Sequence, residues 1–394
     1  MRWASSISSE AQLDAAVAEC SDALEAGLDG LAPHLVAGFV SPDFADRWTR
    51  LPSLLARRFP GTTLLGCSAN GVVGGGREVE GERALALVAA HLPSVRVTPL
   101  VVRSGDFVDL EAVCPRIATL QAEASPSFVV LPDPFSCPAE TLIGELDRLF
   151  PGSVKIGGLA SAARQPGGNL LWAGDEAVHG GAVGVVLEGG LAVDTLVAQG
   201  CRPIGMPLFV TMGQGHLIQQ LDGRRPLDLL RELYDAASPR DRELFRGSLF
   251  LGVVMRDGES AYGPGDFLVR NLIQLDAESG ALAVAAEIRE GSVVQFHLRD
   301  AQTSADDLAA HLRDSEHAAR PAGALLFSCL GRGRHLYGAP DHDSQVFAAR
   351  WAGVPLGGFF CNGEIGPVHG RTFLHGYTSS FGLFRSAKAR VAVG

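Results

Sequence analysis

The sequence predicts an α/β protein with two related lobes, each built from mixed β-sheets flanked by helices. The chain has 394 residues, more than one hydrophobic core usually serves, so two domains are expected. Apolar runs of strand length alternate with helical patterns along it. The 48 glycines are about 12% of the residues, against a usual ~7%. They gather at the ends of the apolar runs, where turns or close backbone contacts require them.

The first lobe is expected to follow an opening helix, because apolar residues recur at helical spacing from Leu13 to Leu24, just before Gly27. A buried strand is then predicted over 34–40, and a helix from about 41 to 59. The next elements are also read from apolar runs: strands over 62–66, 84–91 and 95–102, a helix over about 110–123, and a strand over 128–131.

One order of elements occurs twice. The strand 128–131, the helix 138–150 and a strand over 154–159 containing Gly157-Gly158 form the first copy. The second copy consists of the strand 324–329, the helix 344–351 and a strand over 354–360 containing Gly357-Gly358, with return strands at 372–377 and 379–384. This order indicates an internal duplication, although convergence would give the same pattern. The paired glycines also fit simple tight turns between strands.

The predicted boundary lies at about 205–215, around a segment with two prolines and no flexible linker. The domains expected are therefore an N-terminal helix within 1–29, an α/β lobe over 30–208 and a second α/β lobe over 209–390. A crevice between packed lobes is the default place for a ligand.

The charge and the cysteines narrow the range of partners. The formal net charge is −11 and no Lys/Arg cluster forms a basic face, so nucleic acid and anionic membrane are not expected partners. The start lacks a signal-peptide pattern, and no apolar run approaches the ~20 residues that span a bilayer. The seven cysteines are widely spaced and include no C-x-x-C pair, which is typical of reduced thiols. We therefore expect a cytoplasmic protein.

Four segments carry candidate ligand-binding residues, each at a turn or a strand end. In 325–333 an apolar strand leads to a Gly-Arg-Gly turn, and in 357–367 a strand ends in Asn-Gly-Glu; the other two segments are 266–271 and 295–300. Together they supply arginine forks, carboxylate acceptors, amides and a thiol. The candidates are Arg270, Asn271, Arg299, Asp300, Cys329, Arg332, Gly333, Asn362, Gly363 and Glu364.

An amino-acid-like ligand needs a cationic fork and an acceptor close together, so we expect these ten residues to converge on one pocket. The glycines beside Arg332 would let backbone amides approach the ligand. A structural ion pair between Arg332 and Glu364 is the alternative. Cys67 and Cys361 fit small core residues, whereas Cys329 beside an arginine is expected to be the most readily alkylated thiol.

These segments resemble the C-terminal half of the FIST family, through Phe-Ser-Cys-Leu-Gly-Arg-Gly at 327–333, Gly-Phe-Phe-Cys-Asn-Gly-Glu-Ile-Gly-Pro at 358–367 and Leu-His-Gly-Tyr-Thr-Ser-Ser at 374–380. The N-terminal half is similar to the family more loosely, through stretches at 66–71, 156–161 and 197–205. The resemblance implies small-ligand sensing for signal transduction, with an amino acid or a similar metabolite as ligand. No kinase, receiver or F-box segment is evident, so an output domain is expected to be a separate signalling protein or to be absent.

An enzyme is the less favoured interpretation. A cysteine-dependent hydrolase or transferase needs a histidine placed by a third group, and no histidine here has a recognisable orienting partner in the sequence. There is no G-x-S-x-G elbow, P-loop or opening G-x-G-x-x-G motif. Asp341-His342-Asp343 is typical of a solvated loop, so neither a metal nor a cofactor is expected. A protein-interaction scaffold is the third alternative.

Overall fold

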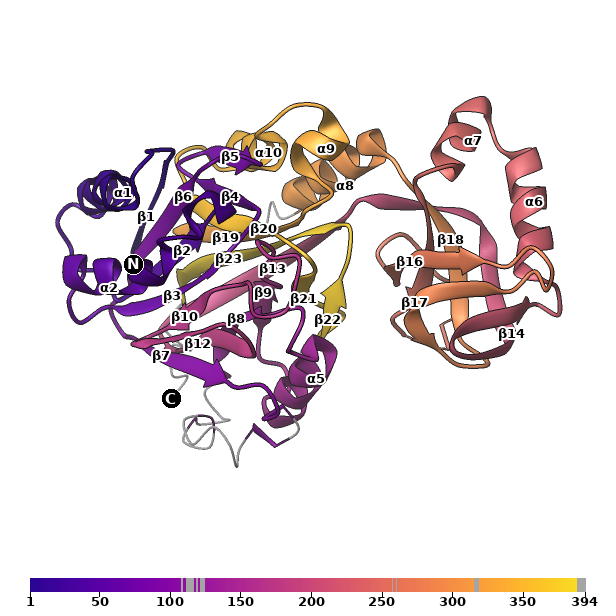
Figure 1. The fold of residues 1–394 in the computed structure, drawn as a ribbon, viewed down its shortest axis with the longest axis horizontal. Coiled ribbons are helices and arrows are strands. Elements are labelled where there is room, and N and C mark those ends of the chain that lie inside the picture. Colours follow the sequence, from indigo (N-terminus) through magenta and orange to yellow (C-terminus); the bar gives the residue numbers. More distant parts are fainter. Residues whose placement is uncertain are drawn as a thin grey trace, which may run out of the picture. The chain divides into compact units, whose positions relative to one another are not determined.

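The computed structural model describes residues 1–107, 109–110, 117, 120, 125–256, 258–259, 261–314 and 319–387, which form two compact units (Figure 1). The first unit contains Met1–Val197, Ala310–Leu374 and the described residues from Thr378 onward. The second unit contains Ala198–Ala309 and His375–Tyr377. None of the described helices is both long enough and apolar enough to cross a membrane.

Within the described residues, the first unit holds three six-stranded sheets. Sheet I has the order β1 (Arg2–Ser8), β6 (Leu85–His91), β2 (Leu35–Val40), β3 (Thr63–Ser68), β10 (Leu171–Ala173), β11 (Glu176–Val178). Sheet II has the order β7 (Val95–Val102), β12 (Ala182–Gly189), β8 (Ser127–Pro132), β9 (Lys155–Gly158), β21 (Glu364–Val368), β22 (Arg371–His375). Sheet III has the order β13 (Leu191–Gln199), β23 (Thr378–Ser386), β19 (Gly323–Cys329), β20 (Leu356–Cys361), β4 (Gly71–Gly74), β5 (Arg77–Glu80).

The three sheets are built alike. Each has a central parallel pair, which is β2–β3, β8–β9 or β19–β20, and a later strand of the same repeat pairs antiparallel with its first member. A hairpin from another repeat completes each sheet: β10–β11 joins sheet I, β21–β22 joins sheet II and β4–β5 joins sheet III. The chain therefore folds as three equivalent repeats that exchange hairpins cyclically.

The predicted duplication is thus part of a threefold pattern, and a glycine holds the same register in each copy. Gly66, Gly157 and Gly358 each lie in the second strand of a parallel pair, not in a turn. A Cβ added to them would come within 2.1, 1.8 and 1.8 Å of the carbonyl oxygen of the residue paired with each on the neighbouring strand. Only glycine permits this backbone approach, which explains the recurring glycines in place of the suggested tight turns.

One hydrophobic core is shared by all three sheets, with members such as Leu65, Val129 and Phe327. The other face of sheet I is covered by α1 (Leu13–Gly27) and α2 (Leu51–Arg58), and short 3₁₀ turns at Pro42–Phe44 and Trp48–Arg50 precede α2. That of sheet II is covered by α5 (Ala139–Leu149). On sheet III, Phe347 of α10 (His342–Arg350) stacks on Phe381, with ring centroids 5.8 Å apart. These helices lie at the periphery of the unit (Figure 1).

The second unit is a closed barrel with the order β14 (Cys201–Leu221), β17 (Leu282–Ile288), β16 (Phe267–Leu275), β15 (Leu249–Val254), β18 (Val293–Arg299). It also contains α6 (Pro226–Ala236) and α7 (Pro239–Phe245), and its core includes Val210, Leu251 and Phe296. The chain enters the barrel after β13 and leaves it through α8 (Ala301–Asp314). The barrel is therefore an insertion into the third repeat.

The predicted α/β class, with mixed sheets flanked by helices in two compact parts, is confirmed. The two parts are not related lobes, because the second unit is a closed barrel whereas the first contains three mixed sheets. The division of the chain differs from the predicted lobes at 30–208 and 209–390. Strands from residue 323 onward share a core with the N-terminal strands, because the exchanged hairpins tie the repeats together. Only the segment from about 198 to 309 is separate. The opening helix is preceded by the strand β1, and most of the predicted helix at 110–123 lies outside the described residues.

Candidate functional site in the third repeat

The ten predicted site residues fall into two groups. Cys329, Arg332, Gly333, Asn362, Gly363 and Glu364 belong to the first unit, whereas Arg270, Asn271, Arg299 and Asp300 belong to the barrel. In the first unit, the group lies after the carboxyl ends of the parallel strands β19 and β20. Ligands of α/β proteins bind at such strand ends, so this group is a candidate ligand site.

Arg332 is fully buried and forms a bidentate ion pair with Asp343. Its Nε lies 3.0 Å from Oδ2 of Asp343, and its Nη2 lies 3.0 Å from Oδ1. Asp343 also accepts hydrogen bonds from the hydroxyls of Ser328 and Ser379. Burial favours the neutral acid, but the charge of Arg332 outweighs it and holds the pKa of Asp343 well below its ordinary value. Asp343 is therefore a structural ion-pair partner of Arg332.

The Gly-Arg-Gly turn is approached by an anion, but that anion comes from the same chain. Glu80, at the end of the exchanged strand β5, accepts a hydrogen bond of 2.8 Å from the backbone N–H of Arg334. A Cβ on Gly333 would lie 2.3 Å from Oε1 of Glu80. Gly333, whose φ of +56° favours glycine, leaves space for the side chain of Glu80, and the approach of a ligand to this turn stays a prediction.

Glu78 on the same strand is a second buried carboxylate and is 4% exposed. Its Oε1 accepts a hydrogen bond of 2.7 Å from the backbone N–H of Ser344, in the first turn of α10. Burial, followed by the nearby charge of Asp343, raises the pKa of Glu78 to about 8. The β4–β5 hairpin of the first repeat thus holds both ends of the 332–344 segment of the third.

Cys329 occupies a position at which the other two repeats have buried, hydrogen-bonded polar side chains. Counting three residues beyond the partner of each strand glycine gives Ser41, Asp133 and Cys329. The buried Ser41 hydroxyl accepts a hydrogen bond of 3.0 Å from Ala84 N–H, and the buried Asp133 carboxylate accepts one of 2.6 Å from the Ser136 hydroxyl. Cys329 is half-buried, whereas the other five described cysteines are buried. The third repeat therefore has a half-buried cysteine at this position.

Glu364 also differs from its counterparts. Val72, Leu171 and Glu364 each pair with the residue that follows the strand glycine, and all three are fully buried. Glu364 accepts hydrogen bonds from Thr378, of 3.1 Å from the backbone N–H and 2.8 Å from the hydroxyl. A buried carboxylate replaces an aliphatic side chain only here, at a desolvation cost that polar contacts must offset.

Burial raises the pKa of Cys361 well above its ordinary value, and the charge of Glu364 and the thiol of Cys329 raise it further. Both groups therefore lie within electrostatic reach of Cys361. Asn362 and Gly363 hold the neighbouring turn, because the Asn362 amide donates to Ala160 O at 3.3 Å and Gly363 O accepts from Leu159 N at 2.9 Å.

In the barrel unit two of the four predicted residues, Asn271 and Arg299, contact Tyr377, which sequence reasoning did not select. The Tyr377 hydroxyl donates to Oδ1 of Asn271, and the guanidinium of Arg299 lies 5.1 Å from its ring centroid. Asp300 accepts two hydrogen bonds from Arg240, at 2.9 and 3.1 Å. Arg270 is half-buried and donates to the carbonyl of Val269 at 3.2 Å. The only signal for Tyr377 was its place in the 374–380 stretch.

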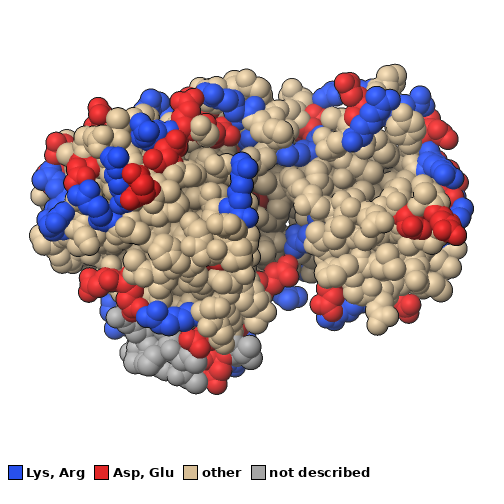
Figure 2. All heavy atoms as spheres, in the orientation of Figure 1, with Lys and Arg blue, Asp and Glu red and all other residues tan. Residues whose placement is uncertain are grey.

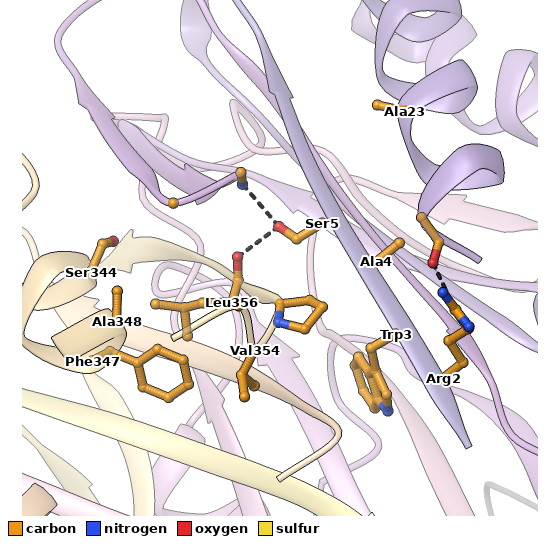
Figure 3. Close-up of a pocket in the computed structure, with 15 residues that line it drawn as sticks. Arg2, Trp3, Ala4, Ser5, Ala23, Ser344, Phe347, Ala348, Val354 and Leu356 are labelled. Atoms are coloured by element: carbon orange, nitrogen blue, oxygen red, sulfur yellow. Dashed lines mark hydrogen bonds between the residues drawn. The ribbon is translucent and has the colours of Figure 1, made fainter. Parts of the chain in front are cut away.

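The first unit also has a pocket of about 570 Å³ that the sequence did not indicate. It is lined by Arg2, Trp3, Ala4, Ser5, Ala23, Gly27, Gly75, Gly76, Ser344, Phe347, Ala348, Gly353, Val354, Pro355 and Leu356. Figure 3 shows the labelled residues arriving from β1, α1, α10 and the segment leading into β20. Residues near both ends of the chain form it, so no local motif marks it. Ser344 lines the pocket and directly follows Asp343, which links the pocket to the buried ion pair.

Comparison with known proteins finds two family domains in this chain, one in its N-terminal half and one in its C-terminal half. The FIST N domain matches residues 34–224, and the FIST C domain matches residues 226–367. The chain therefore belongs to the FIST family, as the resemblance implied. The two matches meet within the barrel unit, after β14, and do not coincide with the compact units.

Several relatives share much of the chain. It is 36% identical over 387 residues to an uncharacterized protein of Mycobacterium tuberculosis strain H37Rv, covering 98% of this chain and 100% of the relative. An uncharacterized protein of Mycobacterium bovis is 36% identical over 362 residues, covering 91% and 92% of the two chains. An F-box/LRR-repeat protein of Arabidopsis thaliana is 27% identical over 187 residues, covering 41% of this chain and 34% of the relative.

We predict that Arg332→Ala lowers the free energy of unfolding by about 3–5 kcal/mol without any ligand, because it leaves the Asp343 carboxylate buried and unpaired. Arg332→Lys should restore stability only in part, since lysine cannot form the bidentate contact. Urea denaturation measures the change. The control is Arg334→Ala, whose side chain is 55% exposed and should shift stability by less than about 0.5 kcal/mol. Equal effects of the two alanine variants would contradict this assignment.

Glu78 should make stability pH-dependent. Its pKa of about 8 in the folded protein exceeds the ordinary value of 4.5, so its contribution is complete below pH 4.5 and is lost as the pH rises through 8. Glu78→Gln should flatten this decline and narrow the fall in Tm between pH 6 and 9 by about 3 °C or more. Thermal melts at several pH values measure it, with the 67% exposed Glu82 changed to Gln as control. An unchanged pH slope in the Glu78 variant would refute this role.

Proposed function

We propose that this protein is a sensory protein of signal transduction that binds a small metabolite, such as an amino acid, in the first-unit pocket and signals through a separate partner protein. One observation carries the proposal: the pocket and the buried Arg332–Asp343 pair share the first turns of α10. The family association with signal-transduction sensing agrees with it.

The route from pocket to surface runs along α10. Ser344, Phe347 and Ala348 line the pocket, and Asp343 is held by Arg332. A ligand that shifts α10 would move Asp343 and, through the ion pair, the 329–334 turn with its half-buried Cys329. Buried, well-packed pairs change between discrete arrangements more readily than they deform, which suits a switch.

The surface is suited to a protein partner. Six large apolar side chains of the barrel are exposed: Met206, Phe209, Met212, Leu217, Ile273 and Leu275. Exposed large apolar side chains are often found on interaction surfaces, which also keeps the scaffold alternative open. On the face shown in Figure 2, Lys/Arg and Asp/Glu side chains are interspersed on each unit, an arrangement that does not favour nucleic acid or an anionic membrane as partner. The described cysteines are free thiols, which suits the cytoplasm as the place of action.

Filling the pocket tests this function. Ala348 is exposed and lines the pocket, whereas Ala349 is exposed on the same helix and does not. We predict that an amino-acid and metabolite panel contains a ligand that stabilises the wild type by about 2.7 kcal/mol at one hundred times its Kd. Ala348→Trp should weaken that ligand at least tenfold in calorimetric titration, and Ala349→Trp should leave it unchanged. Equal affinities in both variants would place the ligand elsewhere, and the absence of any ligand would refute sensing.

Thiol chemistry is the second candidate, favoured by one contact. Nδ1 of His342 lies 3.0 Å from Oδ1 of Asp343, and its ring stacks on Tyr337 with centroids 3.5 Å apart. His342 thus has the orienting partner that the sequence did not reveal. Arg332 pairs with the same carboxylate of Asp343, so Asp343 is less able to raise the basicity of His342.

We predict that limited iodoacetamide labels Cys329 before the buried thiols, because burial raises the pKa of Cys20 to about 11 and that of Cys137 to about 12. Peptide mass spectrometry gives the order of labelling. If His342 acts as the base for Cys329, His342→Ala slows labelling at least tenfold; an unchanged rate argues against the enzyme. Labelling of Cys20 ahead of Cys329 would contradict an open 329–334 turn.

A further inference from the structure

We infer that the first-unit pocket selects a small monocarboxylate with an apolar body and no free ammonium group. This rests on the proposed function, and within its class of small metabolites it favours carboxylates that lack the ammonium group over amino acids themselves. Among the residues that line the pocket, the only charged side chain is that of Arg2, and none carries a carboxylate. The lining thus offers a counter-charge to an anion and none to a cation.

Arg2 is placed to receive a carboxylate at the rim. Its Nε donates to the carbonyl of Gly27 at 2.9 Å, and its Nη1 lies 2.5 Å from Oδ2 of Asp29. These contacts fix a guanidinium whose side chain is 46% exposed and which has five N–H donors in a planar fork. Asp29 is itself 64% exposed, and such solvated pairs hold weakly, so a ligand carboxylate can share or displace it.

The interior of the pocket is suited to the apolar body. Phe347 and Leu356 contribute buried apolar walls, and the indole of Trp3 is fixed by stacking on Phe384, with ring centroids 4.6 Å apart. The Gly75-Gly76 turn adds no side chain to the space. Ser344 of α10 also lines the pocket and carries no charge. Figure 3 shows Ser344 and Arg2 on different sides of this lining.

The pocket lining has no carboxylate to accept an ammonium group, so we expect it to bind simple carboxylates more tightly than amino acids. A zwitterionic ligand would bring its ammonium next to Arg2, which has the same sign. The pocket lining contains no carboxylate, and the solvated Asp29 carboxylate at the rim is already paired with Arg2. Desolvating an ammonium without a counter-charge is costly, and the gain at Arg2 does not offset it. The same side chain without the α-ammonium keeps the carboxylate contact and avoids this cost.

Three matched probes test the inference by calorimetric titration: 3-phenylpropionate, its neutral analogue 3-phenylpropanamide, and L-phenylalanine, which adds the ammonium. The wild type should bind 3-phenylpropionate at least tenfold more tightly than either of the others. Arg2→Gln should reduce that affinity to the level of the amide and leave the amide unchanged. The control is Arg50→Gln, which removes a similarly exposed arginine paired with Asp14 and should change nothing.

The outcomes separate this inference from the proposed function. Equal binding of acid and amide, equal binding of phenylalanine, or no binding of the acid overturns the carboxylate class. In each of those cases, the proposed function still stands if another metabolite binds and Ala348→Trp abolishes its binding. If no metabolite responds to Ala348→Trp, both proposals fail together.

Discussion

The exchange of hairpins among the three sheets is the constraint on which the rest of the first unit depends. Each repeat supplies four strands to its own sheet and two to another, so no sheet is complete without a second repeat. The parallel pairs at the centre of each sheet approach so closely that Gly66, Gly157 and Gly358 tolerate no side chain. Because the inner faces share one core, residues 310–387 cannot separate from residues 1–197 without exposing it.

This repetition provides an internal comparison that a single chain rarely offers. Positions that agree among the repeats serve the fold, as the three strand glycines do. Positions that differ point to function. A half-buried Cys329 stands where the other repeats have the buried Ser41 and Asp133, and a buried Glu364 stands where they have a valine and a leucine. Both changes lie in the third repeat, which also receives the barrel insertion and holds the Arg332–Asp343 pair. The repeat that departs most from the common plan is therefore the one we associate with sensing.

The sequence indicated charged contacts at the 331–333 turn but not the residues that make them. The turn at 331–333 does receive an anion, and Arg332 does form an ion pair. The partners are Glu80 and Asp343, from a hairpin of the first repeat and from a segment that reads as a solvated loop. Such partners are invisible to local patterns because a buried charge is matched through space. A carboxylate 254 residues away satisfies the turn as well as a ligand would.

The sequence by itself determined the fold class, the family and most strands and helices, because apolar periodicity and glycine placement act over a few residues. It indicated the repeat of 128–158 in 324–360 through the order of elements alone. Only the tertiary structure decided that there are three repeats, that their hairpins are exchanged, and that a barrel interrupts the third. It also decided the pocket, whose lining joins residues 2–76 to residues 344–356. Each strand is locally compatible with many pairing partners that are distant in the sequence. The packing of one shared core determines which strands pair and which residues are buried.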